Sequence, residues 1–283
     1  MRFGQRLALV YIRTKFKLLS LVSKRKAAEQ AFILFCTPQH RNSKVLPPIF
    51  DSAETLRFDF RGDAIHGYRW NGDSDRKVLI LHGFESGIVN FDRYVAPLVA
   101  AGFCVLGFDA PAHGRSAGHM INVLLYKEFI EFVQRQFGPV RYFIGHSLGG
   151  LALSLALEDM PGNEQCKAVL IAPATETTTA VDYLFSILQL GPSLRPAFEK
   201  LIEEKGGRPS SWFSVARAAE QIRAQVLWVH DRGDDLTPLS DIEPVIAKQF
   251  PNFRFRITEG LGHRRIYRDN TVAEEIVTFL SQP

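Results

Sequence analysis

A serine between two glycines, Ser147 in the stretch YFIGHSLGG, stands where an apolar strand pattern changes into an apolar helical pattern. A serine contributes little to packing at such a point, and glycines weaken both strands and helices. Gly-x-Ser-x-Gly between a strand and a helix is typical of a nucleophile elbow, a strained turn that presents a serine hydroxyl. The helix that follows points its positive N-terminal end at the site. We therefore predict that Ser147 is a nucleophile.

Ser147 needs a general base, and the base needs an acidic group that orients it. His263, in EGLGHRRIYRD, follows the last predicted strand, at the sheet edge where the elbow also lies. The loop after the preceding strand, VHDRGDDLTP, contains Asp231, Asp234 and Asp235. We predict His263 as the base and Asp234 as the acid, because Asp231 is close enough to the strand end to brace the loop. The alternatives for the acid are Asp231, Asp235 and Glu176.

The negative charge that develops on a carbonyl oxygen during attack needs two backbone N–H donors, which together form an oxyanion hole. We predict Leu148 as one donor, because it directly follows the nucleophile at the N-terminus of the helix. The other predicted donor is Phe84, in the stretch HGFESG after the strand at 78–82. His82, at the start of the same loop, is interpreted as a structural hydrogen-bonding residue rather than a second base.

Short apolar runs alternate with helical patterns around these residues, which predicts a mostly parallel sheet with helices on both faces. Two segments in which apolar and polar residues alternate come first in the chain, joined by a tight turn, and we predict that they form a hairpin. With this hairpin we expect eight strands. The predicted strands are 55–60, 64–70, 78–82, 103–109, 140–145, 168–171, 225–230 and 253–258. The predicted helices are 89–101, 123–137, 147–159, 241–249 and 272–280.

One interval interrupts this alternation. Between 172 and 225 no segment has a convincing strand pattern, several have helical patterns, and glycines and prolines separate them. A surface excursion of this length is more typical of a small helical lid than of a loop. We expect one α/β domain over 52–283, with the lid inserted at about 174–222 and a separate amino-terminal extension over 1–46.

Five segments, in chain order, resemble the loops of the α/β-hydrolase superfamily that carry its chemistry. LHGFESG, FDAPAHGRSAG, GHSLGG, VHDRGDDLTP and GLGHRR are similar to its oxyanion loop, fourth-strand loop, elbow, acid loop and histidine loop. The resemblance extends from about residue 52 to the end, and Ser147, Asp234 and His263 follow the family's order. His113, in PAHGRS, matches a position that usually shapes a loop, so it is left out of the predicted triad.

The resemblance implies hydrolysis of an ester, thioester or amide of a small molecule through an acyl-enzyme, without a cofactor or metal. Members with an aspartate nucleophile, such as epoxide hydrolases and haloalkane dehalogenases, are disfavoured by the serine. Perhydrolases and carbon–carbon hydrolases keep the serine and stay open, as does a non-catalytic ligand-binding protein on the same scaffold. Apolar residues of the predicted lid favour acyl or aromatic esters, unless they only form its packing core: Phe185, Leu188, Leu190, Phe198, Trp212 and Phe213.

The amino-terminal extension carries the chain's positive charge. Residues 1–44 contain ten Lys and Arg against one acid, a net charge of +9, whereas the remaining residues sum to −5. Residues 3–36 predict one or two basic amphipathic helices. Two interpretations stay open: the apolar positions pack on the rest of the chain, or residues 1–36 lie on an anionic membrane surface. The basic residues alternate with apolar residues and not with aromatic residues that could stack on bases, which argues against nucleic acid binding.

The cysteines favour a reducing compartment. Cys36, Cys104 and Cys166 are odd in number and show neither a CxxC pair nor a Cys/His cluster, so a disulfide framework and a zinc site lose support. Basic residues interrupt each apolar run near the amino terminus, and no run approaches the length of a membrane span. We expect a cytoplasmic protein, peripheral to the inner face of the membrane if residues 1–36 bind lipid.

Overall fold

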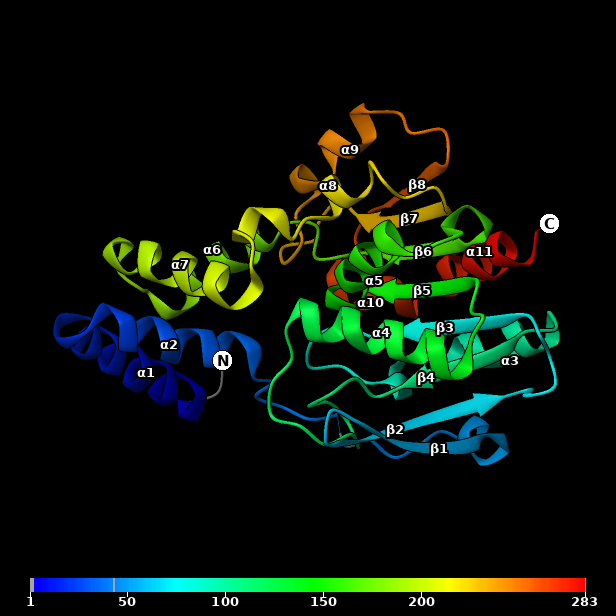
Figure 1. Cartoon of the computed structure of the whole chain (residues 1–283), viewed down its shortest axis with the longest axis horizontal. Coiled ribbons are helices and arrows are strands. Elements are labelled where there is room, and N and C mark those ends of the chain that lie inside the picture. Colours follow the sequence, from blue (N-terminus) through cyan, green and yellow to red (C-terminus); the bar gives the residue numbers. More distant parts are fainter. Residues whose placement is uncertain (1–2, 43, 283) are drawn as a thin grey trace. The chain divides into compact units, whose positions relative to one another are not determined.

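The computed structural model describes residues 3–42 and 44–282, which fall into two compact units (Figure 1). The first, here called the helical unit, consists of the described residues up to 37 together with 176–213. The second, the sheet unit, consists of the described residues from 38 to 175 and from 214 onward. The helical unit therefore combines two chain segments that are separated by most of the sheet unit.

Eight strands form one sheet in the order β1-β2-β4-β3-β5-β6-β7-β8, which confirms the predicted fold class. β1 pairs antiparallel with β2, and β2 antiparallel with β4, whereas the other neighbouring pairs are parallel. β4 and β6 are buried along their whole length, as expected for strands covered on both faces. The strands are β1 (Glu54–Phe60), β2 (Asp63–Trp70), β3 (Lys77–Leu81), β4 (Cys104–Phe108), β5 (Tyr142–His146), β6 (Lys167–Ile171), β7 (Gln225–Asp231) and β8 (Phe253–Thr258).

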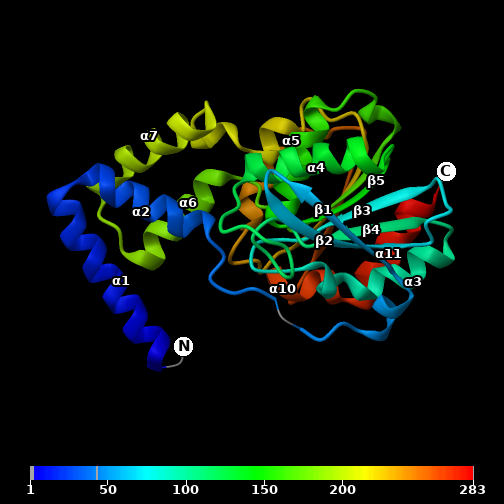
Figure 2. The ribbon, with the colours of Figure 1, turned by 60° about the horizontal axis from the view of Figure 1, so that its bottom comes forward.

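Helices cover both faces of this sheet. α4 and α5 lie on one face, and α3 and α11 lie on the other (Figure 2). The apolar sides of α3 and α11 bury a continuous core against the sheet, which includes Tyr94, Leu98 and Ile276. The long helices of the unit are α3 (Asp92–Ala100), α4 (Val123–Phe137), α5 (Leu148–Asp159) and α11 (Asn270–Ser281).

Two predicted helices of the sheet unit are shorter than their patterns indicate. The segment at 89–101 begins as a 3₁₀ turn and becomes α-helical only from Asp92. The segment at 241–249 is α-helical only over 243–247, because Pro244 has no N–H for the bond to residue 240 that a longer helix would need. The short elements are η1 (Pro48–Ser52), η2 (Ile88–Phe91), η3 (Asn163–Gln165), α8 (Val215–Ala218), η6 (Leu239–Asp241), α9 (Glu243–Ala247), α10 (Gly262–Arg265) and η7 (Ile266–Arg268).

The described residues of the helical unit form helices and their connections, apart from an isolated β-bridge residue at Glu176. No strand lies between β6 and β7, a stretch that the structure describes completely. Within 3–42 and 44–282, no helix combines the length and the apolarity that crossing a bilayer requires. The elements of the unit are α1 (Phe3–Val22), α2 (Lys24–Cys36), α6 (Thr177–Leu188), η4 (Pro192–Leu194), α7 (Arg195–Gly206) and η5 (Ser210–Trp212).

Aromatic residues join the two segments of the helical unit. Phe198 on α7 is fully buried, and its ring centroid lies 6.4 Å from that of Phe32 and 6.0 Å from that of Phe35, both on α2. Phe185 on α6 approaches the same ring at 5.5 Å. The amino-terminal helices therefore pack on the inserted helices. Four of the six apolar residues singled out in the insertion are buried: Leu188, Leu190, Phe198 and Phe213.

Candidate active site

The turn between β5 and α5 has the geometry of a nucleophile elbow. Ser147 has a φ of 52° and a ψ of −120°, a strained conformation for a residue with a side chain. Its N–H donates to the Ile171 carbonyl of β6, and its own carbonyl accepts from the Ala174 N–H. A Cβ at Gly149 would lie 2.6 Å from the His82 carbonyl oxygen, so only glycine allows α5 to approach the end of β3. The neighbouring segments thus hold Ser147 in its strained turn.

The loops that follow β7 and β8 bring an acid and a histidine to this serine. His263 Nε2 lies 3.0 Å from Ser147 Oγ, and His263 Nδ1 lies 2.8 Å from Asp234 Oδ2. Gly260 and Gly262 have φ values of 82° and 60°, a left-handed turn that brings His263 back over the sheet edge. Asp234 and His263 are both buried. The structure therefore places the three predicted side chains in one hydrogen-bonded chain.

The Asp234 carboxylate is held by its own loop. Its Oδ1 accepts the N–H groups of Leu236 and Thr237, and its Oδ2 accepts the Thr237 hydroxyl at 2.8 Å. Burial raises the pKa of Asp234, but the hydrogen bond and charge of His263 and the bonds from Thr237 outweigh burial and hold that pKa below its usual value. An ionised Asp234 favours the His263 tautomer with its proton on Nδ1, which leaves Nε2 free to accept from Ser147.

The other candidate acids have different surroundings. Asp231 accepts the Gly233 N–H on one oxygen, and the Thr258 hydroxyl and the Leu261 N–H on the other. It therefore braces the acid and histidine loops, as its place at the strand end predicts, and both of its oxygens are engaged there. Asp235 is exposed, and Glu176 directly precedes α6 in the helical unit.

The two predicted oxyanion donors flank the elbow. Leu148 is the first residue of α5, where an N–H has no acceptor within the helix. A Cβ at Gly83 would lie 2.8 Å from Ser147 Cβ, so the loop that carries Phe84 runs directly alongside the serine. Within the part of the chain that the structure describes, neither the Phe84 nor the Leu148 N–H donates to a protein acceptor.

Two buried histidines tie this loop to the loop after β4. His82 Nε2 accepts the Ala110 N–H, and His82 Nδ1 donates to the Gly83 carbonyl. His113 Nε2 accepts the Glu85 N–H at 3.0 Å, so it holds the residue next to Phe84. Burial lowers the pKa of His82 to about 4 and, with His82 nearby, that of His113 to about 3. Both rings therefore stay neutral and keep an acceptor nitrogen for these amides.

Sequence reasoning missed two histidines near strand ends, His146 and His230, and one loop residue, Thr237. His146 Nε2 lies 3.1 Å from the His263 carbonyl oxygen and donates to it, and burial, with His263 nearby, lowers the pKa of His146 to about 3. The Thr237 carbonyl lies 2.6 Å from Nε2 of the buried His230, which holds the acid loop against β7. His146 fills the unspecified position before the serine in the elbow motif, so the motif does not single it out. In the acid loop the pattern points only to aspartates, so Thr237 and its partner His230 are not singled out.

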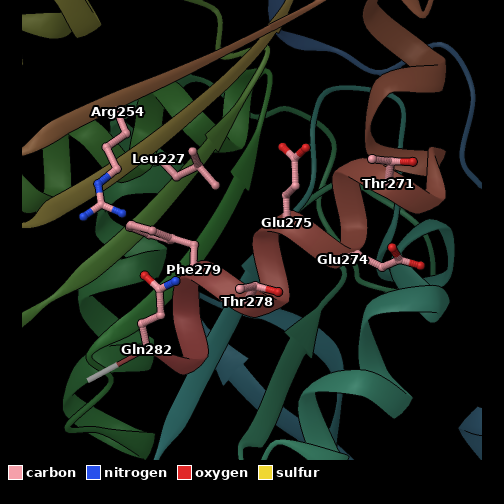
Figure 3. A pocket seen from close by; sticks show the side chains of 8 residues that line it. All are labelled: Leu227, Arg254, Thr271, Glu274, Glu275, Thr278, Phe279 and Gln282. Carbon is pink, nitrogen blue, oxygen red and sulfur yellow. The ribbon is translucent and has the colours of Figure 1, made fainter.

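No group of three or more His, Cys, Asp or Glu side chains in the described part of the chain is arranged to hold a metal ion. A groove of the sheet unit lies on α11 and the strands β7 and β8 (Figure 3). It contains none of the predicted site residues, and Glu275 in its wall is paired with Arg256. Its lining residues are Leu227, Arg254, Thr271, Glu274, Glu275, Thr278, Phe279 and Gln282.

Comparison with protein families gives one match over more than half of the chain. The family profile of Hydrolase_4, described as serine aminopeptidase S33, matches residues 72–232. A "Probable serine hydrolase" of Drosophila melanogaster is 27% identical over 134 residues, which is 45% of this chain and 35% of that protein. A monoacylglycerol lipase of Mycolicibacterium smegmatis is 28% identical over 122 residues, 40% of this chain and 43% of the lipase. The chain spans less than half the length of either relative.

Solved structures share the fold over most of the chain. The Pyrococcus furiosus esterase Pf2001 aligns with a TM-score of 0.63 at 20% identity, over 86% of this chain and 98% of the esterase. A thioesterase domain from the curacin biosynthetic pathway aligns with a TM-score of 0.60 at 18% identity, over 81% of this chain and 99% of that domain. At these identities the likeness establishes the fold alone.

Proposed function

The chain belongs to the Hydrolase_4 family, described as serine aminopeptidase S33, within the α/β-hydrolase superfamily, and on this basis we propose that it is a serine hydrolase that cleaves a carboxylic ester or thioester. One observation carries the proposal: a hydrogen-bonded chain runs from Ser147 Oγ through His263 to Asp234, at 3.0 Å and 2.8 Å. The family description names a peptidase, but the similar proteins include a lipase, an esterase and a thioesterase, which favours an ester or thioester over an amide.

In the first half of the proposed reaction, Ser147 Oγ attacks the carbonyl carbon of the substrate while His263 Nε2 takes the serine proton. Asp234 stabilises the imidazolium that forms, because its carboxylate is ionised and already bonded to Nδ1. The Phe84 and Leu148 N–H groups stabilise the charge on the carbonyl oxygen. The imidazolium then donates its proton to the departing alcohol or thiol as the bond to it breaks, which leaves an acyl group on Ser147.

In the second half, water attacks the acyl group and His263 takes a proton from it as general base. The charge on the oxygen is stabilised by the same two N–H donors. The bond to Ser147 Oγ breaks as His263 returns the proton to the serine, which releases the carboxylic acid and restores the enzyme. Each proton passes through Nε2, the only His263 nitrogen that faces the serine.

The geometry of the site argues against one alternative and does not separate two others from ester hydrolysis. A non-catalytic ligand-binding protein has no need for a strained serine bonded to a histidine, and both the strain and the bond are present. Perhydrolysis and carbon–carbon cleavage use the same three side chains, so they are separated from ester hydrolysis by substrate rather than by geometry.

We propose further that the helices inserted between β6 and β7 act as a lid. The insertion starts just after Ala174, whose N–H donates to the Ser147 carbonyl, so the chain enters the insertion directly from a hydrogen-bond partner of the elbow. Most of its large apolar side chains pack in the helical unit, and substrate preference is therefore not assigned to them. We also propose that residues 1–36, as part of this unit, contact an anionic membrane surface, because their net charge is strongly positive.

The test of the hydrolase proposal is a comparison of two serine variants on p-nitrophenyl esters and thioesters of increasing acyl length. Ser147→Ala should lower kcat/KM by at least about 10³-fold on every substrate that the wild-type chain hydrolyses. Ser186→Ala, at an exposed position on α6, is the matched control and should retain full activity. Circular dichroism should show that both variants are folded. A Ser147→Ala variant that keeps more than a tenth of the activity would contradict the proposal.

A further inference from the structure

Helix α1 has two apolar faces, of which only one is packed. Leu9, Ile12, Phe16 and Leu19 recur at helical spacing and are buried or half-buried in the helical unit. At about 100° per residue, five other apolar residues fall within an arc of about 120° on the opposite side. These five are exposed by 58%, 70%, 60%, 79% and 84%, and we call them the α1 stripe: Val10, Tyr11, Leu18, Leu21 and Val22.

The packed face holds α1 in place on the inserted helices. The Arg13 guanidinium donates to the Ile187 carbonyl at 3.1 Å and 2.7 Å, near the C-terminal end of α6. Ser23 ends α1 and caps α2, where its side chain accepts the Lys26 N–H. The packing interpretation of the amino-terminal extension therefore applies to one face of α1, and the α1 stripe is left for an external partner.

Basic side chains border the α1 stripe. Lys15 and Lys17 are exposed and lie on its two sides, each about 20° beyond the last apolar residue. The sequence of α1 contains four Lys and Arg and no Asp or Glu. Long basic side chains beside an apolar stripe can extend their charged ends into a headgroup layer while the stripe lies below it. Only Thr14 interrupts the stripe with an exposed polar side chain.

A groove adjoins the same side of the helix. It lies between α1 and residues 189–194, with Val10 and Lys17 on one wall and Leu190 and Leu194 on the other. A lysine beside an apolar wall suits the phosphate of a lipid headgroup whose chains run along the stripe. A second copy of this chain is a poorer occupant, because a symmetric contact would bring Lys15 and Lys17 of both copies together.

We propose that the α1 stripe lies in the interface of an anionic lipid bilayer, with its five apolar side chains toward the acyl chains and Lys15 and Lys17 among the phosphates. The inference rests on the proposed membrane contact of residues 1–36, for which it names the face and the partner. It does not depend on ester hydrolysis. The helix lies parallel to the membrane and does not cross it.

Vesicle co-sedimentation of the full chain tests this inference. Wild type should bind vesicles with about 30% phosphatidylserine and not vesicles of phosphatidylcholine alone, and about 0.5 M salt should release it. The triple variant Leu18→Ser, Leu21→Ser, Val22→Ser should bind roughly 1,000-fold more weakly, since each substitution removes an apolar contact worth about tenfold in affinity. The matched control is the double variant Val45→Ser, Met120→Ser, at exposed apolar positions of the sheet unit, which should bind as wild type does.

The outcomes separate this inference from the other proposals. Ser147→Ala should bind as wild type does, so lost catalysis cannot be mistaken for lost docking. Wild type that fails to bind anionic vesicles at low salt would overturn both the stripe and the membrane contact. Equal binding by wild type and the triple variant would overturn the stripe alone. A vesicle-free dimer that the triple variant abolishes would also overturn it, in favour of a second copy. Circular dichroism and an unchanged melting temperature should show that the triple variant is folded.

Discussion

The sheet unit and the helical unit differ in whether their energetically unfavourable residues have partners within the protein. In the sheet unit, the strained backbone of Ser147 and the buried carboxylate of Asp234 each make several hydrogen bonds with nearby backbone groups. In the helical unit, Leu21 and Val22 are exposed apolar side chains that nothing in the described chain covers. Strain and buried charge that are offset by hydrogen bonds within the protein indicate a preorganised site for chemistry. Apolar side chains that stay exposed at the surface indicate an external partner.

The largest effect is expected at the acid loop. Asp234→Asn should lower kcat by about 10⁴-fold, because His263 loses the partner that fixes its tautomer. Asp235→Asn, at the exposed neighbouring position, should change kcat less than about threefold, since its contacts are with solvent. Asp231→Asn should act chiefly on stability, because it braces both loops. Steady-state kinetics with urea unfolding separates these effects, and a loss at Asp235 equal to that at Asp234 would refute the assignment.

Acid should destabilise the sheet unit before the helical unit. His82, His113 and His146 are buried, with pKa values lowered to about 4, 3 and 3, whereas the helical unit has no histidine in its sequence. Below pH 6.5 the unfolded chain binds protons that these folded histidines do not. The free energy of unfolding therefore decreases as the pH falls below about 6.5. The decrease is up to about 1.4 kcal/mol per pH unit for each histidine, until the pH reaches the pKa of the folded state.

Hydrogen exchange of the full chain at pH 7 and pH 5 measures this difference by region. At pH 5, protection should fall in β3, β4 and β5 more than in α2 and α7, after correction for the intrinsic exchange rate. An equal loss of protection in the two units would mean that the buried histidines do not control the acid response.

Two glycines extend the comparison to the backbone. Gly149→Ala should destabilise the protein by about 3 kcal/mol, because the new Cβ would meet the Leu81 and His82 carbonyl oxygens at 2.6 Å. Gly191, in the helical unit, has a φ of −63°, and a methyl group added there would meet no atom of the described chain within 4 Å. Gly191→Ala should therefore be neutral or slightly stabilising. Urea unfolding of both variants checks this prediction. Equal free energies of unfolding for the two variants would show that the elbow accommodates a methyl group that its contacts should exclude.

The fold and the positions of the site residues could be predicted largely because local patterns record them. A buried parallel strand is a short apolar run, and the elbow and the acid loop each follow such a run, whereas the histidine loop follows the alternating pattern of the edge strand β8. The bond from His146 to the His263 carbonyl joins residues 117 positions apart, and no spacing or periodicity records such a contact. The packing of Phe32 and Phe35 on Phe198 is invisible in sequence for the same reason.

The central claim is that the sheet unit presents one activated serine, and active-site labelling tests it most directly. The full chain is incubated with a fluorophosphonate, and the adduct is counted by intact mass and located by peptide mass spectrometry. One adduct per chain on Ser147, absent in His263→Ala over the same time, is the predicted result. An adduct on a different residue, or an unlabelled chain that still hydrolyses p-nitrophenyl esters, would contradict the account.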